Sequence, residues 1–308
     1  MSVQGLVNIK NAIASLNPEQ VRRMSERPMR IAICAANAEG FEQIENFLLS
    51  DLRAERRRES RYFLIRDREP AGKTYDLTIY HQGVFAPPRA LVFRAENPEW
   101  LIQRALDTHG DLGVALARAF PPFRSLFIDR VIANTSRENA LFSIATALPD
   151  VIPSIIELPW AIAEFASDTA FLTMNQMKMA FLIAAASDRE VGYRQQRSEI
   201  ATVIASAFGW RALARQLVGK VPFGGGLIAK AAVAYAGTKV VGLSLNHYYS
   251  IGYTYSREER DHLYTDALNQ GKKVAARILA KLRPDLAKKF GAAGGTEQAN
   301  FSSPSEKA

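Results

Sequence analysis

The chain has few of the residues that usually indicate a chemical function. Its 308 residues include one cysteine, Cys34, which excludes an internal disulfide framework and favours a reducing compartment. There are four histidines, His81, His109, His247 and His262, and none has another histidine or a cysteine at the spacing of a metal site. The first residues show no charged leader followed by an apolar core, so we expect no secretory signal. We predict no metal and no cofactor, and we expect Cys34 to be a core residue.

The first long apolar passage of the chain, at 140–166, is interrupted by charged residues. A membrane-spanning helix needs about 20 mostly apolar residues, but the passage 140–166 carries Asp150, Glu157 and Glu164 among several prolines. The carboxylates follow one another at intervals of seven, so on one continuous helix each would turn only about 20° from the last and form an acidic stripe. The prolines argue against one straight helix, because an interior proline removes a backbone hydrogen bond.

Two further apolar passages cover 169–187 and 217–245, and the second contains Lys230 and Lys239 among small residues that allow close helix packing. Unpaired charge in apolar surroundings is costly. We therefore predict that some of the three carboxylates face these lysines inside a helical bundle, either soluble or inserted in a membrane. The alternative is that each helix turns its charged side chains to water.

Distributed motifs mark the region between residues 140 and 255. They are Pro149-Asp150, Asn175-Gln176-Met177, Val191-Gly192-Tyr193, Phe208-Gly209, Val221-Pro222-Phe223-Gly224-Gly225-Gly226, Tyr235, Thr238, Gly242 and Tyr248-Tyr249. This set resembles a bacterial domain of unknown function that is found fused to Era-like GTPase domains and in relatives of YcjF-type inner-membrane proteins. The resemblance implies association with a membrane and with GTPase-type regulation, but it implies no established chemistry.

Nearer the N-terminus the pattern is that of a small α/β unit. The compact apolar run 30–35 predicts a strand, and the spacing of Phe41, Ile44 and Leu48 predicts the helix after it. Further strands are expected at 62–65, 75–80 and 90–93. Alternation of strands with helices indicates a parallel or mixed sheet.

The turn after the first strand is where a phosphate-binding loop would lie. In register with G-x-x-x-x-G-K-[ST] it reads Ala35-Ala36-Asn37-Ala38-Glu39-Gly40-Phe41-Glu42, so it keeps only the second glycine, with Phe41 in the place of the phosphate-binding lysine. Likewise, Tyr80-His81-Gln82-Gly83 lies in the place of the D-x-x-G element and lacks its aspartate. A degenerate GTPase half and an unrelated small α/β domain both fit this region. Neither is expected to hydrolyse GTP.

The stretch 51–69 interleaves arginines with acidic residues, which is typical of a solvated helix and disfavours a nucleic-acid site. Tyr62 and Phe63 are expected in the core of the following strand. Asn97-Pro98 predicts a helix start, with an apolar face formed by Trp100, Leu101, Ala105 and Leu106. Because no glycine- or serine-rich linker separates the α/β unit from the helical region, we expect the two to pack on each other.

The last predicted helix, 257–289, becomes basic after Gln270. Basic residues recur at every fourth position, at Lys273, Arg277 and Lys281. An apolar row runs beside them, formed by Val274, Ile278 and Leu282. Such a helix could lie on an anionic membrane surface, and the alternative is a helix docked on its own protein with its lysines in water.

The whole sequence thus predicts an α-rich α+β protein. The expected segments are an N-terminal helical lead (1–28), a small α/β domain resembling a degenerate GTPase half (29–96), a helical connector (97–139), a helical family domain (140–256), a basic amphipathic helix (257–289) and a disordered tail (290–308). The expected role is that of a membrane-associated scaffold or regulatory protein, at the cytoplasmic face of the inner membrane or in the cytoplasm. A protein partner or homo-oligomer fits this role. The alternative is an enzyme whose active site is the buried cluster around Asp150, Glu157 and Lys230.

Overall fold

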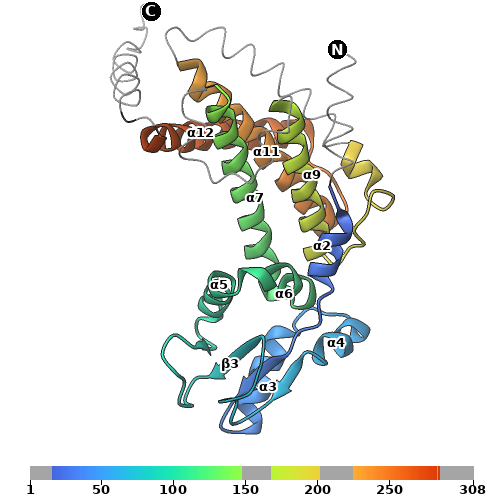
Figure 1. The fold of residues 1–308 in the computed structure, drawn as a ribbon. Helices are drawn as coiled ribbons and strands as arrows, with labels where there is room; N and C mark the ends of the chain where they lie inside the picture. The colour runs from blue at the N-terminus through green and yellow to red at the C-terminus, as the bar shows by residue number, and fades with distance from the viewer. Residues whose placement is uncertain (1–15, 148–167, 202–224, 283, 285–308) are drawn as a thin grey trace, which may run out of the picture.

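The computed structural model describes residues 16–147, 168–201, 225–282 and 284. Helices make up most of this part of the chain, and one small sheet lies at one end of the molecule (Figure 1). The predicted α-rich α+β class is confirmed. The first part of the expected N-terminal helical lead (1–15) and the expected C-terminal tail (290–308) lie outside the described residues.

The sheet has four parallel strands in the order β2-β1-β3-β4. They are β1 (Ile31–Cys34), β2 (Leu64–Arg66), β3 (Leu77–His81) and β4 (Leu91–Phe93). Each strand overlaps its predicted position, because the apolar runs that fill a buried sheet are visible in the sequence. The central strand β1 is buried along its whole length.

Two helices with capped starts contact this sheet. The first is α3 (Ala38–Leu48), which packs against β1 and β3 and buries Ile44 and Leu48. The second is α5 (Pro98–Thr108), which packs against β4 and begins where Asn97 accepts a hydrogen bond from the Trp100 N–H at 3.3 Å. The predicted start of α5 at Asn97-Pro98 is explained by this capping chemistry.

Two aromatic residues lie elsewhere than the sequence predicts. Tyr62 ends α4 (Ala54–Arg61), where its N–H donates to the Glu59 carbonyl, and it is 87% exposed instead of lying in a strand core. Tyr62 is the C-cap residue of α4, although the apolar pattern assigned it to the strand, and only Phe63 of the pair packs on the core. Trp100 is 41% exposed because the buried face of α5 is formed by Leu101, Ala105 and Leu106.

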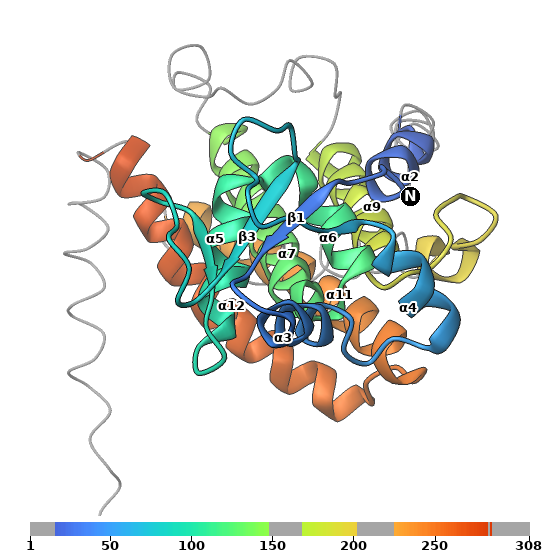
Figure 2. The same cartoon turned by 90° about the horizontal axis from the view of Figure 1, so that it is seen from below.

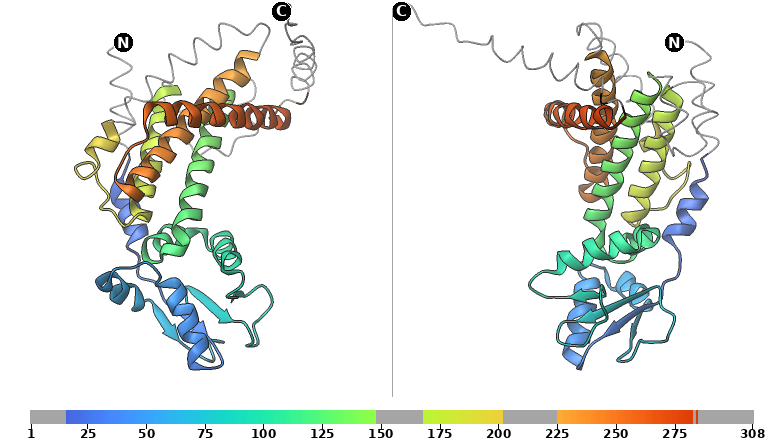
Figure 3. Two further views of the ribbon diagram at one scale, coloured as in Figure 1. Left: turned by 180° about the vertical axis from the view of Figure 1, so that it is seen from behind. Right: turned by 60° about the vertical axis from the view of Figure 1, so that its left-hand side comes forward.

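Long helices form the rest of the molecule. They are α7 (Pro121–Ala145), α9 (Asp168–Ala186), α11 (Gly225–Ile251) and α12 (Arg257–Leu282). Figures 1 and 3 show α7, α9 and α11 side by side, with α12 lying across α7 and α11 at the end far from the sheet. The helix α7 runs unbroken through residues 139 and 140, so the expected connector and helical domain are continuous at that point.

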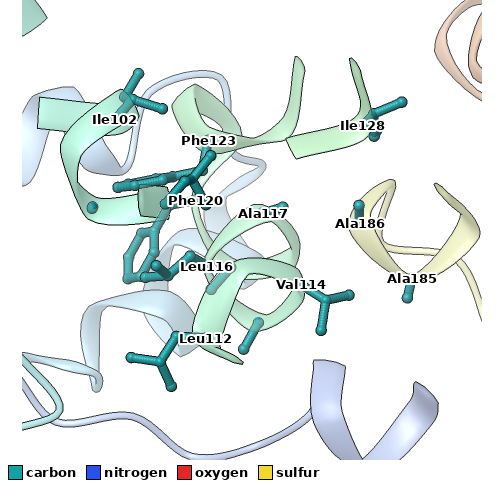
Figure 4. Close-up of a cluster of buried hydrophobic side chains, with 14 of the residues drawn as sticks. Ile102, Leu112, Val114, Leu116, Ala117, Phe120, Phe123, Ile128, Ala185 and Ala186 are labelled. Atoms are coloured by element: carbon teal, nitrogen blue, oxygen red, sulfur yellow. The ribbon is translucent and has the colours of Figure 1, made fainter. Parts of the chain in front are cut away.

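Sheet and bundle share one hydrophobic core. Short elements join them at η1 (Gly110–Leu112) and α6 (Gly113–Ala119), and α2 (Pro18–Ser25) packs against α6 and α9. Figure 4 shows Phe120 and Phe123 beside Leu116, with α9 lying nearby. Seen from below the sheet, the bundle lies directly behind it (Figure 2). The predicted packing of the two parts on each other is therefore present.

Two glycines allow the closest helix contacts. A Cβ at Gly242 of α11 would lie 2.7 Å from Ile132 Cγ1 of α7 and 3.0 Å from Met179 Sδ of α9. A Cβ at Gly271 of α12 would lie 2.7 Å from the backbone oxygen of Ala232 in α11. All three distances are shorter than van der Waals contact, so the helices approach each other where the side chain is missing.

Candidate functional site

The turn between β1 and α3 is the segment that the sequence aligns with a phosphate loop. A side chain of the turn, that of Asn37, occupies one of its backbone N–H groups. The chain passes from the strand to the helix through Ala35, Ala36 and Asn37. The Asn37 side-chain oxygen accepts a hydrogen bond from the Gly40 N–H at 2.9 Å. Phosphate loops leave such N–H groups free for the ligand, and here the capping residue takes this one.

Phe41 and His81 fill the space beside this turn. Phe41 is 5% exposed and belongs to the core. A phosphate-binding lysine at this position would instead have to reach outward to the ligand. A side chain at Gly40 would meet Ala35 Cβ at 3.0 Å and His81 Cγ at 3.2 Å. The glycine is thus explained by the close approach of the β3 end, so Tyr80-His81-Gln82-Gly83 does lie next to the turn. His81 Nε2 lies 2.9 Å from Gln43 Oε1, so the end of β3 and the helix α3 are joined beside the turn.

An ion-pair cluster after β2 is a feature that the sequence patterns missed. Asp67 is 10% exposed and accepts hydrogen bonds from Lys73 Nζ at 2.8 Å and from the Tyr75 hydroxyl at 2.6 Å. These two bonds hold the pKa of Asp67 at about 2. The hydrogen bond to Asp67 also raises the pKa of Tyr75. All three groups satisfy one another, so the cluster holds the connection between β2 and β3 in place.

Cys34 is confirmed as a core residue. Its thiol is 5% exposed and donates to the Arg68 carbonyl at 3.3 Å. Burial raises the pKa of the Cys34 thiol, and the nearby Asp67 carboxylate raises it further. A thiol with a raised pKa and little exposure is a poor nucleophile.

The predicted charge cluster is described only in part. Asp150, Glu157 and Glu164 lie outside the described residues, while Lys230 and Lys239 both lie on α11 and are half-buried. Lys239 Nζ donates to Gln270 Oε1 of α12. The pairing of these lysines with the three carboxylates stays a prediction.

Polar side chains join the helices α7, α9 and α11. Asn139 of α7 donates its Nδ2 to Thr238 Oγ1 of α11 at 2.8 Å, and Asn175 of α9 donates to Asn139 Oδ1 at 2.9 Å. Gln176 Nε2 reaches the same threonine oxygen at 3.1 Å. Asn175, Gln176 and Thr238 belong to the motifs noted in the sequence, and these three residues hold the helices together.

The two rows of α12 lie beside each other on the helix but differ in exposure. Val274, Ile278 and Leu282 are half-buried against a cluster that includes Ala140, Ile144 and Tyr235. The basic residues of this half of the helix are exposed: Lys272, Lys273, Arg277 and Lys281. The apolar row is thus used by the protein itself, and the basic row is left on the surface.

Metal and membrane signals are weak in the described part of the chain. Over these residues no group of three or more metal-ligating side chains is found. His247 stacks on Tyr255, with ring centroids 3.9 Å apart. One of the described helices, Gly226–Ile251, is long and apolar enough to cross a bilayer, but it packs against α7, α9 and α12 as a core helix would.

Comparison of the chain with known protein families, with curated proteins and with solved structures finds no match. The resemblance of the motifs to a bacterial domain therefore stays a prediction.

Proposed function

We propose that the protein is a non-hydrolysing scaffold or regulatory protein that binds peripherally to an anionic membrane surface through the basic half of α12. The observation that carries this proposal is the exposure of four basic side chains on residues 272–282, a stretch that contains no acidic residue. The first half of the same helix is mixed in charge, with Glu258, Glu259 and Asp261 near its start. Positive charge is thus concentrated at one end.

The expected attraction is sufficient for reversible binding. Each basic residue near an anionic surface contributes about 1 kcal/mol, so four contribute roughly 4 kcal/mol, or about a thousandfold in partitioning. Part of the charge pattern also suits the helix dipole, which favours acidic residues at the start and basic residues at the end. The helix dipole by itself therefore explains the sign of these charges without a membrane surface.

The packing of α12 supports peripheral binding over insertion. Its apolar row is half-buried against α7 and α11, whereas its basic row is exposed, so lipid would meet mainly charged side chains. The neighbouring helix α7 exposes Arg137 and Glu138 beside the same end of the bundle. Exposed charges of both signs favour an aqueous or headgroup environment there.

The α/β part supports a role without nucleotide hydrolysis. Phe41 in the core and the capped N–H of Gly40 leave the turn without the lysine and free amides that phosphate binding needs. We infer that a relationship to GTPase-linked proteins, as the motifs imply, would be one of fold and partnership. The setting proposed is the cytoplasmic face of the inner membrane.

Vesicle co-sedimentation tests the proposal. The full chain should sediment with vesicles of phosphatidylcholine and phosphatidylserine, should stay in solution with phosphatidylcholine alone, and should be released by high salt because exposed charges are screened. The variant Lys273→Gln, Arg277→Gln, Lys281→Gln should lose at least tenfold in vesicle affinity, since it removes about three of the four contributions.

A matched control removes the same charge elsewhere. The variant Arg53→Gln, Arg58→Gln, Arg260→Gln neutralises three exposed arginines outside the basic half of α12 and should bind as the parent does. Equal losses in the two variants would mean that net charge alone attracts the protein. Extraction from cell membranes by detergent but not by salt would overturn peripheral attachment and favour insertion.

A further inference from the structure

A cavity of about 400 Å³ lies between the segment that follows α9 and the last turn of α11. Its walls include Gln196, Glu199, Tyr248 and Tyr249. Arg189 and Glu190 also line it and are exposed. Small-molecule sites have volumes of about 300–1,000 Å³ and a few well-placed polar groups, and this cavity is of that kind.

Glu199 contributes a buried carboxylate to the cavity. It is 9% exposed, and its Oε1 accepts a hydrogen bond from the Tyr249 hydroxyl at 3.1 Å. Its Oε2 accepts from the Ser198 hydroxyl at 2.7 Å. Among the described residues no basic side chain lies within ion-pair distance of it.

The neighbouring contacts hold this carboxylate in a fixed place. Gln196 donates its Nε2 to the Tyr249 hydroxyl at 3.1 Å and to the Ala180 carbonyl at 3.3 Å. Burial raises the pKa of Tyr249, so its hydroxyl stays protonated and serves as a donor to Glu199. The Glu199 carboxylate is thus held in place by Tyr249, whose hydroxyl is itself fixed by the Gln196 side chain.

The other buried carboxylate of the described chain, that of Glu45, is neutralised, and so is the half-buried carboxylate of Asp188. Glu45 is 6% exposed and pairs with Arg66 at 2.6 Å and with Arg61 at 3.0 Å. Asp188 pairs with Arg56 at 2.9 Å and lies 3.4 Å from Arg118. A buried charge without a partner is expensive, so the lack of one at Glu199 calls for a ligand that supplies it.

The charge of the cavity also runs against that of the protein. The chain has a net charge of +8, yet this cavity contains two carboxylates, Glu190 and Glu199, and one guanidinium, that of Arg189. Tyr248 is 38% exposed and presents an aromatic ring at the same wall. Carboxylates with tyrosine rings are the groups that bind organic cations.

We propose that this cavity binds a small organic ammonium ion, with Glu199 as its counter-charge and Tyr248 as an aromatic contact. The ammonium group donates hydrogen bonds to the Glu199 carboxylate, and its alkyl part lies against the tyrosine ring. This site is independent of the basic half of α12, which lies at the other end of α11.

Calorimetric titration of the full chain with n-pentylammonium tests the site, with 1-pentanol as the neutral probe of matched size. We expect saturable binding of the amine and none of the alcohol at the same concentrations. The variant Glu199→Gln keeps the side-chain shape and should weaken amine binding at least tenfold. Glu258→Gln, on the exposed start of α12, is the matched control and should leave binding unchanged.

The thermal midpoint of Glu199→Gln separates a ligand site from a structural one. Removal of an uncompensated buried charge should leave the midpoint equal or higher, whereas a structural carboxylate would lower it. If Glu199→Gln does not fold, the surface variant Tyr248→Ala decides instead and should weaken amine binding several-fold. Absence of saturable amine binding, equal binding of pentanol, or unchanged affinity in these variants would overturn the proposal.

Discussion

At the scale of single residues, the acids Glu45 and Asp67 are neutralised by nearby side chains. Glu45 is paired with arginines from α4 and β2, and Asp67 is paired with a lysine and a tyrosine of the loop that follows it. Such pairs hold neighbouring segments together, because loss of either partner leaves a buried charge. Both clusters are structural. They differ from Glu199, which has no basic partner among the described residues.

Asp67 should give the protein a specific sensitivity to acid. Its pKa in the folded chain is about 2, below the ordinary 3.8, so its stabilising contribution is fully present above pH 3.8 and is lost as the pH falls toward 2. Asp67→Asn should lower the free energy of unfolding at neutral pH and flatten its decline in this window. Denaturant unfolding between pH 2 and 7 measures both effects.

A second variant checks the cause of that shift. Tyr75→Phe removes one of the two hydrogen bonds to Asp67 and should give a pH dependence between those of the parent and Asp67→Asn. A Tyr75→Phe curve that coincides with that of the parent would show that the tyrosine contributes nothing to the shift.

At the scale of elements, the position of α12 is set by contact between backbones. Gly271 faces the Ala232 carbonyl of α11, and Ala267 and Ala275 are fully buried on the same side. The small residues recur along one face of α12, where they let the helix lie close across α11. The same arrangement turns the basic row outward, so the surface charge of α12 depends on this contact.

Gly271→Ala should therefore destabilise the protein although alanine is the better helix former. The added methyl would lie 2.7 Å from a backbone oxygen, which cannot move aside as a side chain can. Overpacking should cost about 1–3 kcal/mol, and the gain of about 1 kcal/mol from helix propensity offsets only part of it, so we expect a net loss of up to about 2 kcal/mol. Thermal and denaturant unfolding measure the difference.

Gly242→Ala is the matched comparison within α11. There the nearest atoms belong to the side chains of Ile132 and Met179, and methionine adapts readily to a new neighbour. We expect a smaller loss than at Gly271. The reverse order would contradict the interpretation that backbone contact positions α12.

At the scale of the whole molecule, the sheet and the bundle form one unit. Leu116, Phe120 and Phe123 are fully buried where α6 and α7 meet the sheet, and they belong to the same core as β1 and α9. An element that stabilises this junction acts on both parts. A ligand or a membrane that stabilises the bundle should therefore also stabilise the α/β part.

Phe123→Ala should destabilise both parts together. Removal of a fully buried phenylalanine leaves a cavity and should cost about 3–5 kcal/mol. Hydrogen exchange should become faster in β1 and in α11 alike, because both depend on the shared core. Phe85→Ala, at a side chain that is 93% exposed, is the control and should change stability by less than about 0.5 kcal/mol. Faster exchange in only one part would show two independent units.

Local chemistry made some elements predictable. Asn17, Asn37 and Asn97 cap the helices that follow them, and the apolar runs of the strands lie where the sheet needs them. Tyr62 shows the limit, since an aromatic residue between a helix and a strand suits either element. Which of the two takes it depends on how far α4 extends before Phe63 reaches the core.

The sequence by itself determined the α-rich α+β class, the strand order along the chain, the defects of the phosphate loop and the basic end of α12, because each rests on residue type and near spacing. Only the tertiary structure decided that the apolar row of α12 packs against α7 and α11, that His81 lies against Gly40, and that Glu199 accepts a hydrogen bond from Tyr249. These contacts join segments far apart in the chain. Their geometry depends on how whole helices pack, and no local pattern contains it.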